Sequence, residues 1–265
     1  MKRLLVSAVI LPLAAATGLA QNNVPVIREE AGECPLFAEL ALDVYSAYVW
    51  RGMVLNDEPV WQPGLKLGAD LQDYGKAYAG AWLNLDLTKR NRRTAFGGLN
   101  ELDYRAGYQI GLGNFEMDAG HRWYTFPKAN GPDYGASTRE VYASLAYAND
   151  IVVPFIEVNY DYSVVEGVYA VTGLRKEVRV EDRLTLGAEV TLGGGSHGMT
   201  KFYYGEPGKM WVTDANAALF ATFDLTEHLF VGARLAWMSA LDNRLKGVYH
   251  KDDILWGGIS LGATF

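Results

Sequence analysis

Charged side chains recur at every second position over residues 99–126. Glu101, Asp103 and Arg105 alternate with apolar residues up to a short break at residues 111–114, and the same alternation resumes after it. Successive side chains of a strand point to opposite faces, so the pattern predicts a hairpin with one charged and one apolar face. Carboxylates and guanidiniums that share a face can pair with one another or select ions in a water-filled lumen.

Two catalytic residue types, Ser196 and His197, lie side by side in the glycine-rich segment 193–198. Adjacent residues diverge, and no orienting carboxylate is evident, so the pair does not indicate nucleophilic catalysis. The four histidines of the chain lack metal-ligand spacing. The glycines 193–195 precede no helix-forming stretch and therefore predict no phosphate-binding loop. The sequence predicts a protein that is not an enzyme and that holds no metal and no cofactor.

The alternation continues to the last residue and defines the elements that position the charged face. Its segments are about 10 to 13 residues long, which suits tilted strands that cross a bilayer, whereas strands of soluble proteins average about 5 to 6. A soluble β-sandwich would also alternate, but it would not need this length. The sequence thus predicts an all-β fold, a transmembrane antiparallel β-barrel. The twelve predicted strands cover residues 39–51, 60–71, 77–87, 99–110, 115–126, 138–147, 152–163, 168–180, 184–192, 210–223, 229–239 and 254–265.

The connections between these strands alternate in length. Those near Asn114 and Asn149 are short, whereas those near Arg92 and Gly205 are long. Bacterial outer-membrane barrels have short turns on one side and long loops on the other, and an even strand number returns both ends of the chain to the short-turn side. The pattern therefore predicts a location in the outer membrane of a Gram-negative bacterium.

The N-terminal residues are expected to lie outside the barrel. Residues 1–20 have two basic residues, an apolar run too short to span a membrane as a helix, and small residues at the end, which is typical of a secretory signal peptide. Residues 21–38 are polar and without period, so they predict a flexible periplasmic leader, in which Cys34 is an unpaired thiol. The predicted transmembrane β-barrel then occupies residues 39–265.

The charge of the exported chain limits its partners. Loss of residues 1–20 removes two basic residues and no acidic one, which leaves 22 basic against 31 acidic residues and a net charge of about −9. This balance argues against a nucleic-acid partner. Tyrosine and tryptophan together number 23, a composition that suits long strands with aromatic belts at both membrane interfaces.

Several segments, taken in order along the chain, resemble the TorF family of outer-membrane porins. They are residues 48–52 (YVWRG), 75–86, 101–104 (ELDY), 107–108 (GY), 124–127 (YTFP) and 140–142 (EVY). The resemblance covers about half of the exported chain and implies a channel whose solute is poorly defined. Phe265, preceded by apolar residues at every second position, resembles the closing strand that the outer-membrane assembly machinery recognises.

The charged face supplies the candidate pore-lining residues. An arginine or lysine that faces lipid near the midplane costs about 2 to 4 kcal/mol, so these charges are expected to face the lumen. Twelve strands leave a narrow lumen, in which the charges could either select ions or pair and fill the interior. The candidates are Asp43, Arg51, Lys66, Asp70, Asp86, Asp103, Arg105, Glu116, Asp118, Arg122, Glu157, Asp161, Arg175, Glu177, Arg179, Glu189, Asp214 and Arg234.

Arg51 has two interpretations: a rim residue that filters solutes, or one half of a salt bridge that fixes the first strand. The whole chain is expected to be a porin-like channel for passive diffusion of small hydrophilic solutes or ions. The alternatives are an outer-membrane enzyme that acts on lipids and a non-conducting structural or adhesive barrel, which complete pairing of the lumen charges would favour. Expected partners are outer-membrane lipids and lipopolysaccharide, and small lipid-facing residues such as Ala77 and Ala79 permit a homo-oligomer.

Overall fold

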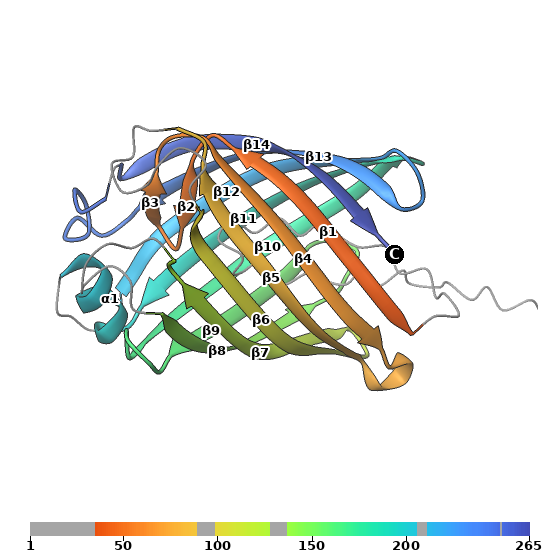
Figure 1. The fold of residues 1–265 in the computed structure, drawn as a ribbon, viewed down its shortest axis with the longest axis horizontal. Coiled ribbons are helices and arrows are strands. Elements are labelled where there is room, and N and C mark those ends of the chain that lie inside the picture. The colour runs from red at the N-terminus through yellow and green to blue at the C-terminus, as the bar shows by residue number, and fades with distance from the viewer. Residues whose placement is uncertain (1–34, 89–98, 128–136, 206–210, 250) are drawn as a thin grey trace, which may run out of the picture.

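The computed structural model describes residues 35–88, 99–127, 137–205, 211–249 and 251–265. Twelve antiparallel strands form a closed barrel, in which every strand pairs with its neighbours in sequence order and β1 pairs with β14 (Figure 1). This confirms the predicted fold and strand number. The predicted signal peptide and most of the predicted leader lie outside the described residues. No helix in the described part of the chain is long and apolar enough to cross a membrane.

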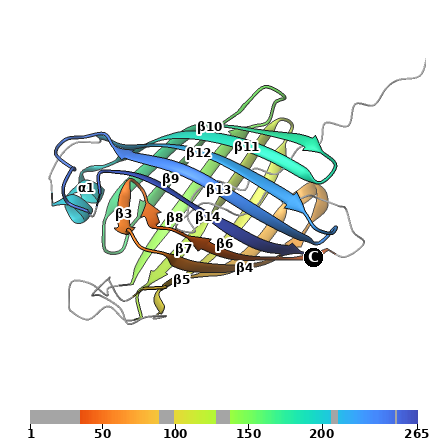
Figure 2. The same ribbon diagram turned by 90° about the horizontal axis from the view of Figure 1, so that it is seen from above.

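The barrel strands are separated by short turns at one end and longer connections at the other. A short 3-10 helix, η1 (Gln72–Tyr74), makes one of the turns, and the α-helix α1 (His197–Tyr204) lies at the opposite end (Figures 1 and 2). The barrel strands are β1 (Leu36–Tyr45), β4 (Val60–Asp70), β5 (Lys76–Asp86), β6 (Leu99–Leu112), β7 (Phe115–Thr125), β8 (Thr138–Tyr147), β9 (Val153–Asp161), β10 (Gly167–Glu181), β11 (Leu184–Gly195), β12 (Trp211–Asp224), β13 (Leu229–Ala240) and β14 (Asp253–Thr264).

The first and last barrel strands meet at the seam that closes the barrel. Ala38 and Phe265 exchange two backbone hydrogen bonds of 2.9 Å, so the C-terminal residue itself pairs with β1. β1 begins at Leu36, three residues before the predicted start of the barrel. Closure satisfies backbone groups that an open edge would leave unpaired in lipid. Leucine and isoleucine side chains such as Leu65 and Ile259 point outward along the wall and are 44% and 66% exposed.

The first predicted strand, residues 39–51, is wrong at its end. β1 stops at Tyr45, and the chain turns into a separate hairpin made of β2 (Tyr48–Trp50), which lies within the first predicted strand, and β3 (Met53–Asn56), which lies between the first two predicted strands. Arg51 and Gly52 form the two-residue turn, both with positive φ (48° and 77°). Two positive φ angles are typical of the type I′ turns that join tight hairpins. Figure 1 shows this hairpin at the long-loop end.

Inward-facing aromatic rings lie opposite inward-facing glycines of the next strand. Phe37 is paired with Gly68, Phe220 with Gly187, and at several further places the same combination recurs. A Cβ atom on either of these glycines would overlap the opposite ring, so the ring occupies the room that the missing side chain leaves. Cross-strand packing of this kind stabilises glycine in a sheet. The further pairs are Tyr45 with Gly258, Tyr78 with Gly107, Phe155 with Gly173, and Phe230 with Gly262.

Candidate functional site

The hairpin β2–β3 crosses the barrel interior from β1 to the far wall. A Cβ atom added to Gly52, at its tip, would lie 2.5 Å from the Cβ atom of Asp214 on β12. Met53 and Val54 are fully buried, and Met53 packs with Met199 of α1 and with neighbouring apolar residues. The hairpin therefore occupies the lumen at the long-loop end, where both the barrel wall and α1 contact it.

Two hydrogen bonds hold the base of the hairpin to the near wall. The Tyr48 hydroxyl donates to Glu101 of β6 at 2.8 Å, and the Asn56 amide donates to Asp86 of β5 at 2.7 Å. Tyr48 also packs edge-on against Trp82, with ring centroids 5.9 Å apart. These contacts connect the hairpin to strands β5 and β6.

Arg51 holds the tip of the hairpin to the opposite wall. Its Nη2 atom lies 2.8 Å and 2.7 Å from the two carboxylate oxygens of Glu140 on β8. The guanidinium also lies over the rings of Trp50 and Tyr169, 4.5 Å and 4.9 Å from their centroids, a cation–π arrangement. Burial disfavours the charge, but the carboxylate of Glu140 opposes this effect, and the pKa of Arg51 lies above its ordinary value. Arg51 is therefore a charged, buried contact of the hairpin.

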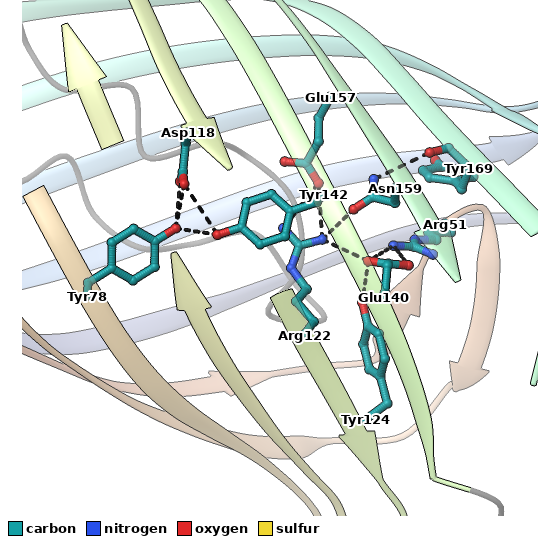
Figure 3. A network of polar contacts seen from close by, with 10 residues as sticks. All are labelled: Arg51, Tyr78, Asp118, Arg122, Tyr124, Glu140, Tyr142, Glu157, Asn159 and Tyr169. Atoms are coloured by element: carbon teal, nitrogen blue, oxygen red, sulfur yellow. Dashed lines mark hydrogen bonds and ion pairs between the residues drawn. The ribbon is translucent and has the colours of Figure 1, made fainter. Parts of the chain in front are cut away.

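Arg122 of β7 is the centre of the polar network in the lumen (Figure 3). Its Nη1 atom lies 3.0 Å from Glu140, 3.1 Å from Glu157 and 2.5 Å from the side-chain oxygen of Asn159. The guanidinium lies 3.9 Å from the ring centroid of Tyr142. Glu140 thus accepts hydrogen bonds from both Arg51 and Arg122, so one carboxylate joins the hairpin to the wall network.

A group of tyrosines extends this network toward the short-turn end. The hydroxyl of Tyr78 donates to Asp118 at 2.7 Å and contacts the hydroxyl of Tyr142, as Figure 3 shows. Gly107 leaves the room for these two rings, since a Cβ atom there would overlap both hydroxyl groups. Arg105 lies over the ring of Tyr78, 4.8 Å from its centroid. Side chains therefore fill one side of the lumen over much of its length.

Ion pairs also line the lumen closer to the short turns. Arg175 pairs with Glu177 at 2.5 Å and approaches Glu189 at 3.8 Å, and Arg234 lies 3.6 Å from Glu189. Lys66 pairs with Glu39 at 2.6 Å. Many of the inward charges are thus paired across strands.

All but one of the candidate pore-lining residues lie at positions of the barrel strands whose side chains face the lumen. Arg51 belongs to the hairpin, so its salt bridge holds the hairpin and not the first strand. The structure brings Arg51, Arg122 and Glu157 into one network and places Asp70 and Arg179 away from it, near the short turns. That these residues line a conducting pore stays a prediction.

Several residues that organise the interior were not among the predicted site residues. Glu140 and Glu101 have the same parity as the candidates, so the alternation could have identified them. The tyrosines Tyr78, Tyr142 and Tyr169 were also missed. In each strand the tyrosine alternates with the outward aliphatic residues, so it shares the inward face with the charged residues. This alternation could have identified the three tyrosines, because a tyrosine on the inward face places its hydroxyl in the lumen.

The glycine-rich segment 193–195 leads into α1, contrary to the expectation that no helix follows it. Ser196 precedes the helix, and its hydroxyl accepts a hydrogen bond of 2.8 Å from the backbone N–H of Val168. The serine thus joins the helix to the start of β10. In the part of the chain that the structure describes, no group of three or more acidic, histidine or cysteine residues could hold a metal ion.

Comparison with solved structures defines the class of fold as a closed antiparallel barrel, which this chain shares with outer-membrane channels. The COG4313 outer membrane channel from Pseudomonas putida F1 superposes with a TM-score of 0.55 over 91% of this chain and 99% of its own, at 11% identity. The NanC porin gives a TM-score of 0.50 over 86% of this chain and 98% of its own, at 14% identity. At these identities the likeness concerns the fold alone.

The sequence comparison assigns the family. The chain belongs to the family described as bacterial protein of unknown function (Gcw_chp), whose profile matches residues 29–203. The match covers β1 to β11 and most of α1, and thus includes the hairpin β2–β3 and the Arg122 network. No curated protein matches the sequence.

Proposed function

We propose that this protein is an outer-membrane channel for passive diffusion of small hydrophilic solutes or ions, with the hairpin β2–β3 at its constriction. The observation that carries the proposal is the closed barrel with a charged inner face and an apolar outer face. Such a wall is suited to lipid outside and to water inside. The resemblance of the sequence to the TorF family of outer-membrane porins supports the same function.

The hairpin determines how such a channel must work. Arg122, Glu140 and Glu157 are each 1% exposed, and the hairpin packs beside them. In the proposed channel, a solute passes this level when the hairpin moves away from the wall. The hairpin is therefore the gate of the proposed channel, and the Arg51–Glu140 contact is its latch.

A second candidate, a non-conducting barrel, is favoured by the ion pairs inside the lumen. Arg122, Arg175 and Lys66 all have carboxylate partners, so these charges stabilise the interior as it stands. The proposed channel and this alternative differ in one respect only, which is whether the hairpin leaves the lumen. An enzyme that acts on lipids has less support, because the Ser196 hydroxyl is engaged by the backbone of Val168.

The proposed location is the bacterial outer membrane. Phe265 completes the closing strand, which suits recognition by the assembly machinery at that strand. Outer-membrane lipids and lipopolysaccharide are the proposed surroundings of the apolar wall, to which exposed side chains such as Leu65, Leu235 and Ile259 contribute.

The test is the single-channel current of the refolded mature protein in a planar bilayer. Folding is checked first by the mobility shift between heated and unheated samples on a gel. Discrete current steps from folded protein would support the channel. Folded, inserted protein that never conducts would contradict it and favour the non-conducting barrel, and a lipid-hydrolysis assay on the same sample would then test the enzyme alternative.

A further inference from the structure

The charges inside the barrel are distributed unevenly between its two ends. Within five residues of the long-loop end of their strands, the described barrel strands carry eight inward carboxylates but one inward guanidinium, that of Arg122. Arg51 of the hairpin adds the second guanidinium. The other inward cationic side chains, such as Arg105, Arg175 and Arg234, lie farther from this end. Within the described barrel strands, carboxylates therefore outnumber cationic groups near the hairpin.

Only part of this negative charge has a cationic partner. Glu140 pairs with Arg51 and Arg122, and Glu157 pairs with Arg122. Neutral groups hold others: the Tyr48 hydroxyl donates to Glu101 at 2.8 Å, and the Thr138 hydroxyl donates to Asp161 at 2.6 Å. Hydrogen bonds from neutral donors stabilise a carboxylate but leave its charge in place. Among the described residues at this end, carboxylates therefore outnumber the cationic groups that pair with them.

Asp103 and Asp43 differ from these carboxylates, because part of their hydrogen-bonding capacity is unused. Asp103 is 2% exposed and Asp43 is 4% exposed. Both oxygens of Asp103 and one oxygen of Asp43 are buried without a hydrogen-bond partner among the described residues. Asp103 also shares its face of β6 with Glu101, two positions away. When the hairpin leaves the lumen, water reaches both side chains, and the hydrated carboxylates of Asp103 and Glu101 then repel one another and attract a cation.

We propose that the hairpin end of the lumen selects small monovalent cations, with Asp103 and Asp43 as the residues that determine this preference. The inference rests on the proposed channel function and names its class of solute. The described residues form no group suited to coordinate a metal ion, so the carboxylates attract cations through their field and do not chelate them. A lumen lined by one sign of charge concentrates ions of the opposite sign and excludes the others.

The experiment is the reversal potential of the refolded protein in a planar bilayer under a KCl gradient, where potassium and chloride have similar mobility. We expect a potential of the sign that cation flow produces. Asp103→Asn keeps the shape of the side chain, and we expect it to lower the ratio of cation to anion permeability by about fourfold, because one unit charge about 10 Å away in water favours cations about twofold and disfavours anions about twofold. Asp43→Asn is expected to do the same, and the double variant to lower the ratio further.

Asp242→Asn is the matched control, because it removes the same charge at the same end of the barrel from the loop between β13 and β14. We expect it to leave the reversal potential unchanged. Current steps with no ion preference, or with anion preference, would overturn this proposal and leave the channel function intact. Folded protein without any current would overturn both.

Discussion

Arg51 and Glu140 join the tip of the lumen hairpin to the barrel wall across 89 residues of sequence, through two contacts of 2.8 Å and 2.7 Å. Glu140 also binds Arg122, so the same carboxylate belongs to the wall network and to the hairpin contact. This arrangement makes the position of the hairpin depend on one buried ion pair.

Arg51→Ala is predicted to release the hairpin. Loss of one partner of a buried ion pair costs about 3 kcal/mol, which corresponds to a shift of about a hundredfold in the equilibrium between docked and undocked hairpin. We expect a higher open probability in single-channel records. Arg244→Ala is the control, because its partner Asp242 lies in an exposed loop, where such pairs contribute about 0 to 1 kcal/mol. An unchanged open probability in Arg51→Ala would contradict the latch.

Arg122→Met is predicted to destabilise the whole barrel. The substitution leaves Glu157 buried without its cation and removes one of the two cations beside Glu140, at a cost of about 3 to 5 kcal/mol. The measurement is the free energy of unfolding in urea, followed in lipid vesicles. Adding Glu157→Gln to Arg122→Met should recover part of the loss, because it removes the unpaired charge. A double variant no more stable than the single one would argue against this origin.

Gly187→Ala is predicted to disturb the pairing of β11 with β12. The added Cβ atom would overlap the ring of Phe220, and overpacking of this kind costs about 1 to 3 kcal/mol. Gly111→Ala is the control, since a Cβ atom there would meet no atom within 4 Å. The two variants are compared by their free energies of unfolding. Equal stability of both variants would show that the Phe220 ring does not need the space left by Gly187. Adding Phe220→Leu to Gly187→Ala should restore part of the lost stability, because it removes the overlapping ring.

The loop between β13 and β14 has a predicted acid dependence. Hydrogen bonds from Arg244 lower the pKa of Asp242 to about 2 from its ordinary 3.8. The contribution of this pair to stability is therefore fully present above pH 3.8 and is lost as the pH falls through about 2. The titration of the Asp242 carboxyl carbon by NMR measures this pKa. Arg244→Ala keeps the backbone donor but removes the guanidinium, so it should move the pKa part of the way toward 3.8, and an unaltered midpoint would rule out the side-chain hydrogen bonds as the cause.

The sequence predicted the barrel because alternation repeats a simple physical requirement in every strand. Leu65 faces outward and Lys66 faces the lumen, and the same alternation of apolar and polar side chains recurs in each strand. Each alternating segment of the sequence therefore marks one strand, and twelve such segments predict twelve strands. Pairing in sequence order required no further information, because short turns join neighbouring strands.

The hairpin could not be predicted from the same pattern. Tyr48 and Trp50 continue the alternation of β1 beyond Tyr45, although the chain leaves the wall there. What turns the chain inward is contact with distant residues, such as Glu140 and Asp214, which alternation does not reveal. The one local signal was Gly52, which suits the second position of a type I′ turn.

The central claim is that solutes pass the barrel only when the hairpin leaves its place, and a reversible cross-link tests it directly. Arg51→Cys at the tip of the hairpin and Glu140→Cys on β8 replace two side chains that touch at 2.7 Å, in a background with Cys34→Ser. A reducible bis-thiosulfonate reagent joins the two thiols, and each single cysteine variant with the same reagent is the control. We predict that the single-channel current is lost in the cross-linked protein and returns on reduction. The same current before and after reduction would contradict the account.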